Sequence, residues 1–212
     1  MPEIRAAFFD FGGVILSSPF EAFAEYERRT GLPDGFIRGL NATNPDTNAW
    51  AQLERNTVPF DEFCRLYEGE ATEAGHDINA REVMALLSGT VRPEMVGAVQ
   101  RCKERLKTAC LTNNFVSFED FPVEARAEGR DAVLELFDVI IESSKVGVRK
   151  PDPRFYEIAC EACGVEPAEA VFLDDLGINL KPAKAMGMTT IKVIDPDQAL
   201  AELEAVVGFP VR

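Results

Sequence analysis

The chain has 212 residues, of which 46% are hydrophobic and 27% charged, so it holds enough apolar material for one large domain or a core with a smaller insert. Its 22 basic and 36 acidic residues give a formal charge of −14, which disfavours nucleic acid and anionic membrane surfaces as partners. No apolar run approaches the roughly 18–20 residues of a membrane span, no signal segment opens the chain, and the five cysteines show no disulfide pattern. We therefore expect a cytoplasmic protein.

The first predicted element is a strand over residues 4–10, in which the apolar run Ala6–Phe9 leads directly into Asp10. Two glycines, Gly12 and Gly13, follow it and allow a tight turn close to a ligand. The next stretch contains no convincing strand, only helical segments broken by glycine and proline. Because an insertion here would overlie the edge of the sheet, we expect a helical cap domain at 17–91 and a catalytic core formed by 1–16 and 92–212.

Strands and helices alternate through the second half of the chain. A helix is expected to begin at Pro93, since proline suits the first helical position, and another to end at Gly164. The remaining strands are predicted at 107–112, 139–143, 170–174 and 189–193. This alternation predicts an α/β fold with a doubly wound, parallel, Rossmann-like sheet.

Polar residues gather where the predicted strands end. They occur in four segments, marked by Asp10, by Thr112-Asn113, by Lys150, and by Asp174-Asp175 with Asn179. Open parallel sheets bind ligands at this edge, and carboxylates brought together there require a cation, for which Mg²⁺ suits the oxygen ligands. Taken singly, each residue is more often a cap, a turn residue or a surface residue. The prediction of a site depends on all four segments occurring in this order.

The four segments resemble the haloacid dehalogenase superfamily, subfamily IA. Residues 141–153 and 171–188 are similar to the third and fourth motifs of the phosphatase domain of soluble epoxide hydrolases. The resemblance implies a Rossmann-like core with an inserted cap and a phosphatase activity that depends on Mg²⁺. Because the chain ends before an α/β-hydrolase domain could begin, we do not expect epoxide hydrolysis.

The resemblance also implies roles for the acidic residues. Asp10 would be the nucleophile that forms an aspartyl-phosphate. Mg²⁺ would be held by Asp10, the backbone carbonyl of Gly12, and Asp175. Asp174 and Asn179 would orient these ligands from behind.

Three further residues are expected to bind the phosphate. Thr112 and the backbone N–H of Asn113 would hydrogen-bond its oxygens, and Lys150 would add a positive charge, so Asp10, Thr112 and Lys150 form the expected catalytic set. Trp50 is a candidate to line the substrate pocket from the cap, although a place in the interior of the cap explains it equally well. The expected substrate is a small sugar or lipid phosphate, and a homodimer through the cap stays open.

Gly12 occupies the position at which phosphatases of this family carry a second aspartate. That aspartate acts as general acid and base, and losing such a group typically costs ~10²–10⁴ in rate. The first hypothesis is a phosphatase whose leaving group takes its proton from water or another side chain, since some sugar-phosphatase relatives also have glycine here. The second, a dehalogenase, is disfavoured because Asp175 is present and the tyrosine typical of those enzymes is absent. The third is a weak or inactive protein that binds a phosphorylated metabolite or a partner.

Overall fold

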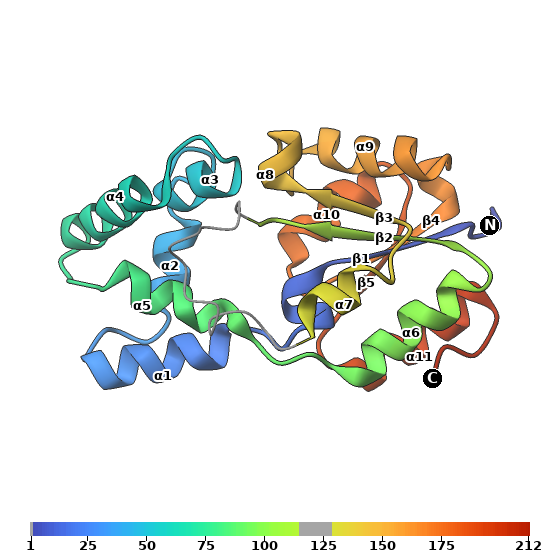
Figure 1. Ribbon diagram of the computed structural model, residues 1–212, viewed down its shortest axis with the longest axis horizontal. Helices are drawn as coiled ribbons and strands as arrows, with labels where there is room; N and C mark the ends of the chain where they lie inside the picture. Colours follow the sequence, from blue (N-terminus) through green and yellow to red (C-terminus); the bar gives the residue numbers. More distant parts are fainter. Residues whose placement is uncertain (1, 115–128) are drawn as a thin grey trace.

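The computed structural model describes residues 2–114 and 129–212, which form a parallel sheet flanked by helices with a helical unit beside it (Figure 1). The sheet has five strands in the order β3-β2-β1-β4-β5, and every pairing in it is parallel. This confirms the predicted fold class. The strands are β1 (Ala6–Phe9), β2 (Lys107–Thr112), β3 (Val139–Glu142), β4 (Ala170–Asp174) and β5 (Thr189–Lys192).

The central strands run side by side, and β1 ends one residue before β4 and two residues before β2. Phe9 lies opposite both Cys110 of β2 and Leu173 of β4, so the residue after β1 reaches the carboxyl edge beside the last residue of β4. The predicted strands at 107–112 and 170–174 match the structure, whereas β1 is shorter than expected at both ends. All four residues of β1 are buried, as expected for the middle strand of a sheet covered on both faces.

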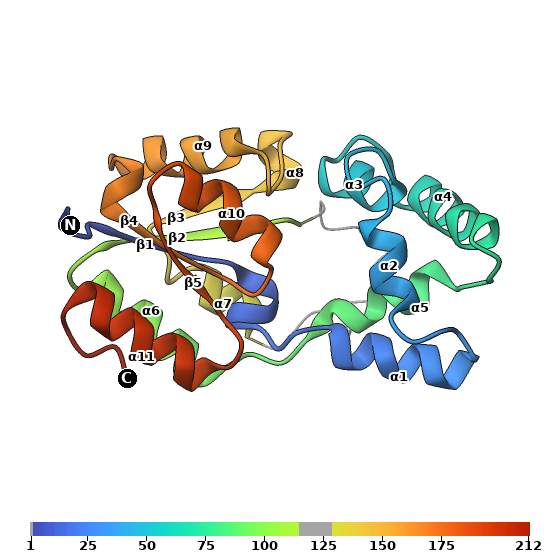
Figure 2. The same ribbon diagram turned by 180° about the vertical axis from the view of Figure 1, so that it is seen from behind.

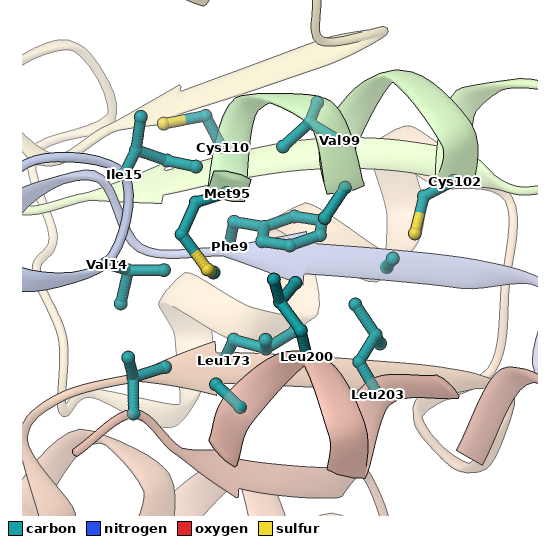
Figure 3. Close-up of a cluster of buried hydrophobic side chains, with 14 of the residues drawn as sticks. Phe9, Val14, Ile15, Met95, Val99, Cys102, Cys110, Leu173, Leu200 and Leu203 are labelled. Carbon is teal, nitrogen blue, oxygen red and sulfur yellow. The ribbon is translucent and has the colours of Figure 1, made fainter. Parts of the chain in front are cut away.

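Successive residues of β1 face opposite sides of the sheet and enter two different apolar cores. Phe8 belongs to the core under α9 (Pro153–Cys163) and α10 (Gly177–Ala185). Phe9 belongs to the core under α6 (Pro93–Lys103) and α11 (Pro196–Val207), where Figure 3 shows it among Met95, Val99 and Leu200. Two shorter helices, α7 (Arg130–Leu134) and α8 (Ser143–Val146), flank β3 in the chain.

The segment between β1 and β2 folds into helices with an apolar core of its own. In α4 (Phe60–Glu73), Phe63 and Tyr67 are fully buried one turn apart, and they pack with residues of the neighbouring helices in a separate cluster. Figure 2 shows this unit beyond the carboxyl ends of the strands. The other helices are α1 (Phe20–Thr30), α2 (Phe36–Ala42), α3 (Ala49–Glu54) and α5 (Ala80–Ala85).

Two chain segments connect the helical unit to the core, and they pair with each other. Leu16 and Val91 form an antiparallel bridge, and the N–H of Ser17 donates to the carbonyl of Thr90 at 2.8 Å. The domain limits expected at 16/17 and 91/92 fall at this crossing and stay a prediction. Within residues 2–114 and 129–212, no helix combines the length and apolar character that a membrane crossing requires.

Candidate active site

Asp10 is held at the carboxyl edge by the backbone around it. Its N–H donates to the carbonyl of Leu173 at 2.9 Å, which extends the pairing of β1 with β4 by one residue. Its Oδ1 accepts a hydrogen bond from the N–H of Phe11 at 2.6 Å. A wide turn follows over Phe11–Ile15, so the buried carboxylate lies where the chain leaves the sheet.

Lys150 lies against Asp10 from a different part of the chain. Its Nζ is 2.9 Å from Oδ1 of Asp10 and 2.7 Å from Oδ2 of Asp174, and its side chain is only 1% exposed. Burial alone would lower the pKa of Lys150, but the carboxylates of Asp10 and Asp174 outweigh this effect and raise it. Lys150 is therefore a permanent cation at this site.

Asn113 fixes the backbone of Lys150. The N–H of Lys150 donates to Oδ1 of Asn113 at 2.8 Å, and Nδ2 of Asn113 donates to the carbonyl of Lys150 at 2.9 Å. Thr112, which precedes Asn113 in the chain, is buried at the end of β2. Its Oγ1 lies 3.5 Å from the carbonyl oxygen of Asn113. That separation is long for a hydrogen bond between oxygens, which leaves the Thr112 hydroxyl capable of donating to a ligand.

The carboxylate of Asp174 is saturated by hydrogen-bond donors. Oδ1 accepts from the N–H of Leu176 and from Nδ2 of Asn179, and Oδ2 accepts from Nζ of Lys150 and from the same Nδ2. Asn179 is itself buried, and its carbonyl accepts the hydroxyl of Tyr156 at 2.7 Å. With two donors on each oxygen, Asp174 serves to hold Lys150 and has little capacity left for a further ligand.

Asp175 completes a cluster of three acids. One carboxylate oxygen from each of Asp10, Asp174 and Asp175 lies within 4.8 Å of the others. Burial, followed by the charge of Asp174, raises the pKa of Asp175 to about 6. Burial is also the main reason why the pKa of Asp10 is raised well above its ordinary value, with Lys150 opposing the shift. When all three acids are ionised they carry three negative charges, and Lys150 is the one cation in contact with them among the residues that the structure describes.

The glycine turn is shaped around Asp175. Gly13 has a φ of +77°, and a Cβ atom placed on it would overlap the carboxylate of Asp175. Gly12 differs, because a Cβ on it would meet nothing within 4 Å. Nη1 of Arg92 donates to the carbonyl of Gly13 at 2.9 Å and fixes the turn from outside. Sequence reasoning did not single out Arg92, which lies 79 residues away from Gly13 in the chain.

These residues fit a divalent cation. The candidate metal ligands are carboxylate oxygens, which suit Mg²⁺, and the ionised cluster has an excess of negative charge. Both donors that the described residues bring to Asp10 approach Oδ1. Asp10 and Asp175 are therefore better placed to hold the cation than the saturated Asp174.

Trp50 lies in the helical unit and apart from the acids. Its ring packs 5.7 Å from that of Tyr67 and 6.1 Å from that of Phe63, centroid to centroid, and its Nε1 donates to Oε1 of Glu54 at 3.0 Å. The structure therefore places Trp50 against the interior of the cap, which was the alternative to a place in the wall of the substrate pocket. Its link to the site passes through Glu54, which contacts Arg149, the neighbour of Lys150.

Sequence reasoning missed Glu54 and Arg149 as functional candidates. Arg149 stands beside Lys150 in the third of the four segments, and this adjacency was the only signal available for it. Glu54 is the last residue of α3, a short helix without any motif, so no local pattern pointed to it.

Comparison with known proteins agrees with the family resemblance seen in the sequence. A family model described as a haloacid dehalogenase-like hydrolase matches residues 4–187. Mouse acyl-CoA dehydrogenase family member 10 is 34% identical, over 98% of this chain and 20% of the mouse protein. Pig bifunctional epoxide hydrolase 2 is 32% identical, over 97% of this chain and 39% of its own length. Phosphatase MT3486 of Mycobacterium tuberculosis is 32% identical, over 88% of this chain and 85% of the phosphatase.

The chain spans less than half the length of the mouse and pig relatives. The match to bifunctional epoxide hydrolase 2 confirms the resemblance that residues 141–153 and 171–188 predicted. Among solved structures, a predicted HAD-like hydrolase of Porphyromonas gingivalis has a TM-score of 0.63 at 20% identity, covering 90% of this chain and 91% of that one. A HAD-family enzyme of Bacteroides thetaiotaomicron, in complex with magnesium and inorganic phosphate, has a TM-score of 0.56 at 19% identity, covering 89% and 93%. At these identities the likeness shows the fold alone.

Proposed function

Because this chain belongs to the haloacid dehalogenase-like hydrolases, we propose that it hydrolyses a small phosphate monoester through a covalent intermediate on Asp10. The observation that carries the proposal is the contact between Asp10 and Lys150 inside the cluster of three acids. A buried carboxylate next to a permanent cation, at the ligand-binding edge of a parallel sheet, is suited to attack on a phosphoryl group. The family shows that the chain is a hydrolase, and the phosphate ester is its proposed substrate.

The metal expected at this site is Mg²⁺. Asp10 and Asp175 would hold it together with the carbonyl of Gly12. When bound, Mg²⁺ would offset the repulsion between the carboxylates and the phosphate and stabilise charge on the transferring group. Asp174 and Asn179 would act one layer back, by keeping Lys150 and the acids in place.

The chain's own residues would carry the two chemical steps. Asp10 attacks phosphorus, so an O–P bond forms to the carboxylate while the bond from phosphorus to the ester oxygen breaks. Lys150, Thr112 and the N–H of Asn113 stabilise the oxygens of the transferring group. Water then attacks the phosphorus, Asp10 leaves as a carboxylate, and inorganic phosphate is released. Since Gly12 carries no acid, the ester oxygen would take its proton from water or from another side chain.

The substrate is proposed to be a small sugar or lipid phosphate that the cap admits to the acids. The cap helices lie beyond the carboxyl ends of the strands, where they can exclude water during turnover (Figure 2). A cytoplasmic location and pairing of two copies through the cap remain predictions from the sequence.

A phosphate-release screen tests this proposal. The purified protein is assayed with Mg²⁺ on aryl, sugar, nucleotide, lipid and amino-acid phosphates, beside Asp10→Asn and a surface control, Asp197→Asn. We expect turnover that requires Mg²⁺, is abolished in Asp10→Asn and is unchanged in the control. A wild-type protein that releases no phosphate from any of these esters would exclude the proposal.

The absence of an acid at Gly12 favours a second candidate function, in which the protein binds a phosphorylated metabolite or a partner without turnover. In that case phosphate esters would bind with Mg²⁺ and remain intact. Dehalogenation is the weaker alternative. Release of fluoride from fluoroacetate without metal would support it.

A further inference from the structure

Arg149 joins the core to the cap. Its Nε lies 2.5 Å from Oε2 of Glu54, the last residue of α3, and its Nη1 donates to the carbonyl of Pro45 at 2.8 Å. Both Glu54 and Pro45 belong to the helical unit between β1 and β2, whereas Arg149 follows β3 in the core. One side chain of the core thus contacts the cap at two points, through a hydrogen bond to Pro45 and through an ion pair with Glu54 that lacks hydrogen-bond geometry.

The ion pair is shielded from water. The side chains of Glu54 and Arg149 are 10% and 16% exposed, in contrast to the cap pair between Glu62 and Arg65, which are 40% and 69% exposed. Burial raises the pKa of Glu54, while the charge of Arg149 opposes the shift. Loss of either partner would leave the other charged group without its counterion in a desolvated place, so the pair favours an arrangement in which cap and core stay in contact.

Arg149 is joined by one peptide bond to Lys150. The backbone of Lys150 is clamped by Asn113, and its Nζ contacts Asp10 and Asp174. Two adjacent residues therefore hold two different parts of the molecule, one the acids of the core and the other α3 of the cap. A displacement of the cap at Glu54 would pull on the segment that positions Lys150.

We propose that Glu54 and Arg149 are positioning residues. Their ion pair holds the cap over the phosphate site and keeps Nζ of Lys150 in contact with Asp10. This inference rests on the proposed function for the identity of the site. It adds a coupling between cap position and phosphate binding. Neither residue touches the reacting atoms in this scheme.

Trp50 gives this contact an optical reporter. It is the only tryptophan of the chain, and its indole N–H donates to Oε1 of the same Glu54 carboxylate that Arg149 contacts through Oε2. The indole is half-buried, and opening of the cap at this contact would increase its exposure to water. Its fluorescence therefore reports the pair directly, without any need for turnover.

The experiment compares Glu54→Gln, Arg149→Gln, the double variant and Arg149→Lys with wild type. Arg65→Gln, which breaks the exposed cap pair, is the matched control. In the ligand-free proteins, acrylamide quenching of Trp50 is measured at a temperature where each variant is folded. We expect quenching to increase in both Gln variants, to return toward wild type in Arg149→Lys, and to stay unchanged in Arg65→Gln.

Binding of inorganic phosphate in the presence of Mg²⁺ is then measured by calorimetry. We expect the dissociation constant to rise about tenfold in each Gln variant, and the double variant to lose less than the product of the two single effects. For an active enzyme, KM should rise more than kcat falls, which a simple loss of folded protein would not produce.

Two outcomes separate the inference from the proposed function. If the wild type turns over no phosphate ester but the Gln variants show increased Trp50 quenching and weaker phosphate binding, the coupling stands and the enzymatic proposal fails. If quenching and phosphate affinity in Glu54→Gln and Arg149→Gln equal those of wild type, the coupling is wrong, whatever the activity.

Discussion

Lys150 and Asp174 form a buried ion pair, with 2.7 Å between Nζ and Oδ2 and side chains that are 1% and 0% exposed. The same Nζ lies 2.9 Å from Asp10, so one ammonium group joins the ends of β1 and β4. Because Asn179 donates to both oxygens of Asp174, this pair cannot rotate freely. The lysine therefore reaches the candidate nucleophile from a fixed base.

Replacing Lys150 with methionine should strongly destabilise the protein. The substitution leaves the buried carboxylates of Asp10 and Asp174 without their cation, and breaking such a pair typically costs about 3–5 kcal/mol. Urea unfolding should show a loss of this size at pH 8, and the loss should become smaller as the pH is lowered, because burial raises the pKa of Asp10 and protonation removes its charge. Lys192→Met, at an exposed position on β5, is the control and should stay near wild type. Equal stability of the two variants at pH 8 would contradict the role assigned to the pair.

Gly12→Asp should increase turnover. A side chain at this position meets nothing within 4 Å, and the backbone φ of −71° suits any residue, so the substitution is sterically open. The added carboxyl group would supply the proton transfer that the turn lacks, a contribution typically worth ~10²–10⁴ in rate. Steady-state kinetics on the best substrate should show a rise in kcat of about 10² or more.

Gly12→Asn provides the matched control for that prediction, since it has the same shape without an ionisable group. Its kcat should remain close to wild type. Equal rates for the Asp and Asn variants would show that proton transfer to the leaving group does not limit turnover.

Gly13→Ala should damage the site, although it lies next to a permissive position. The methyl group would overlap the Asp175 carboxylate, and the φ of +77° disfavours any residue with a Cβ. We expect weaker stabilisation by Mg²⁺ in thermal unfolding and a loss of activity, whereas Gly12→Ala should leave Mg²⁺ stabilisation unchanged. If both alanine variants respond to Mg²⁺ like wild type, the close approach of Gly13 to Asp175 has no functional weight.

Stabilisation by Mg²⁺ should increase with pH. The pKa of Asp175 is raised to about 6 in the metal-free fold, above its ordinary value of 3.8. An acid whose pKa is raised by folding favours the folded state at low pH, and this contribution is lost as pH rises through about 6. Mg²⁺ competes with that proton, so the rise in melting temperature on adding Mg²⁺ should be larger at pH 8 than at pH 5.

Asp175→Asn should separate the two effects. It removes one of three mutually repelling carboxylates, so the metal-free variant should be more stable than wild type at pH 8, by on the order of 1 kcal/mol. At the same time its response to Mg²⁺ should largely disappear. A variant that is less stable without metal, or that keeps the full response to Mg²⁺, would argue against Asp175 as a metal ligand.

The amino-acid sequence alone determined the sheet and the residues that reach its edge. Short buried strands are continuous apolar runs in the sequence, so the runs Ala6–Phe9 and Ala170–Leu173 predicted two strands. The acids directly after these strands were therefore expected together at the carboxyl edge of the sheet. The long stretch without strands between β1 and β2 likewise predicted the helical unit. These features depend on local composition and on connectivity, both of which a single sequence records.

Only the tertiary structure decided how the side chains share their contacts. The sequence did not show that Gly13, and not Gly12, faces Asp175, and it left open whether Trp50 lines the substrate pocket or packs against the interior of the cap. It contained no sign that Glu54 pairs with Arg149 across the boundary between cap and core. Such contacts join residues far apart in the chain and depend on how two separately packed units meet, and the periodicity of a sequence carries information only about the burial of each unit by itself.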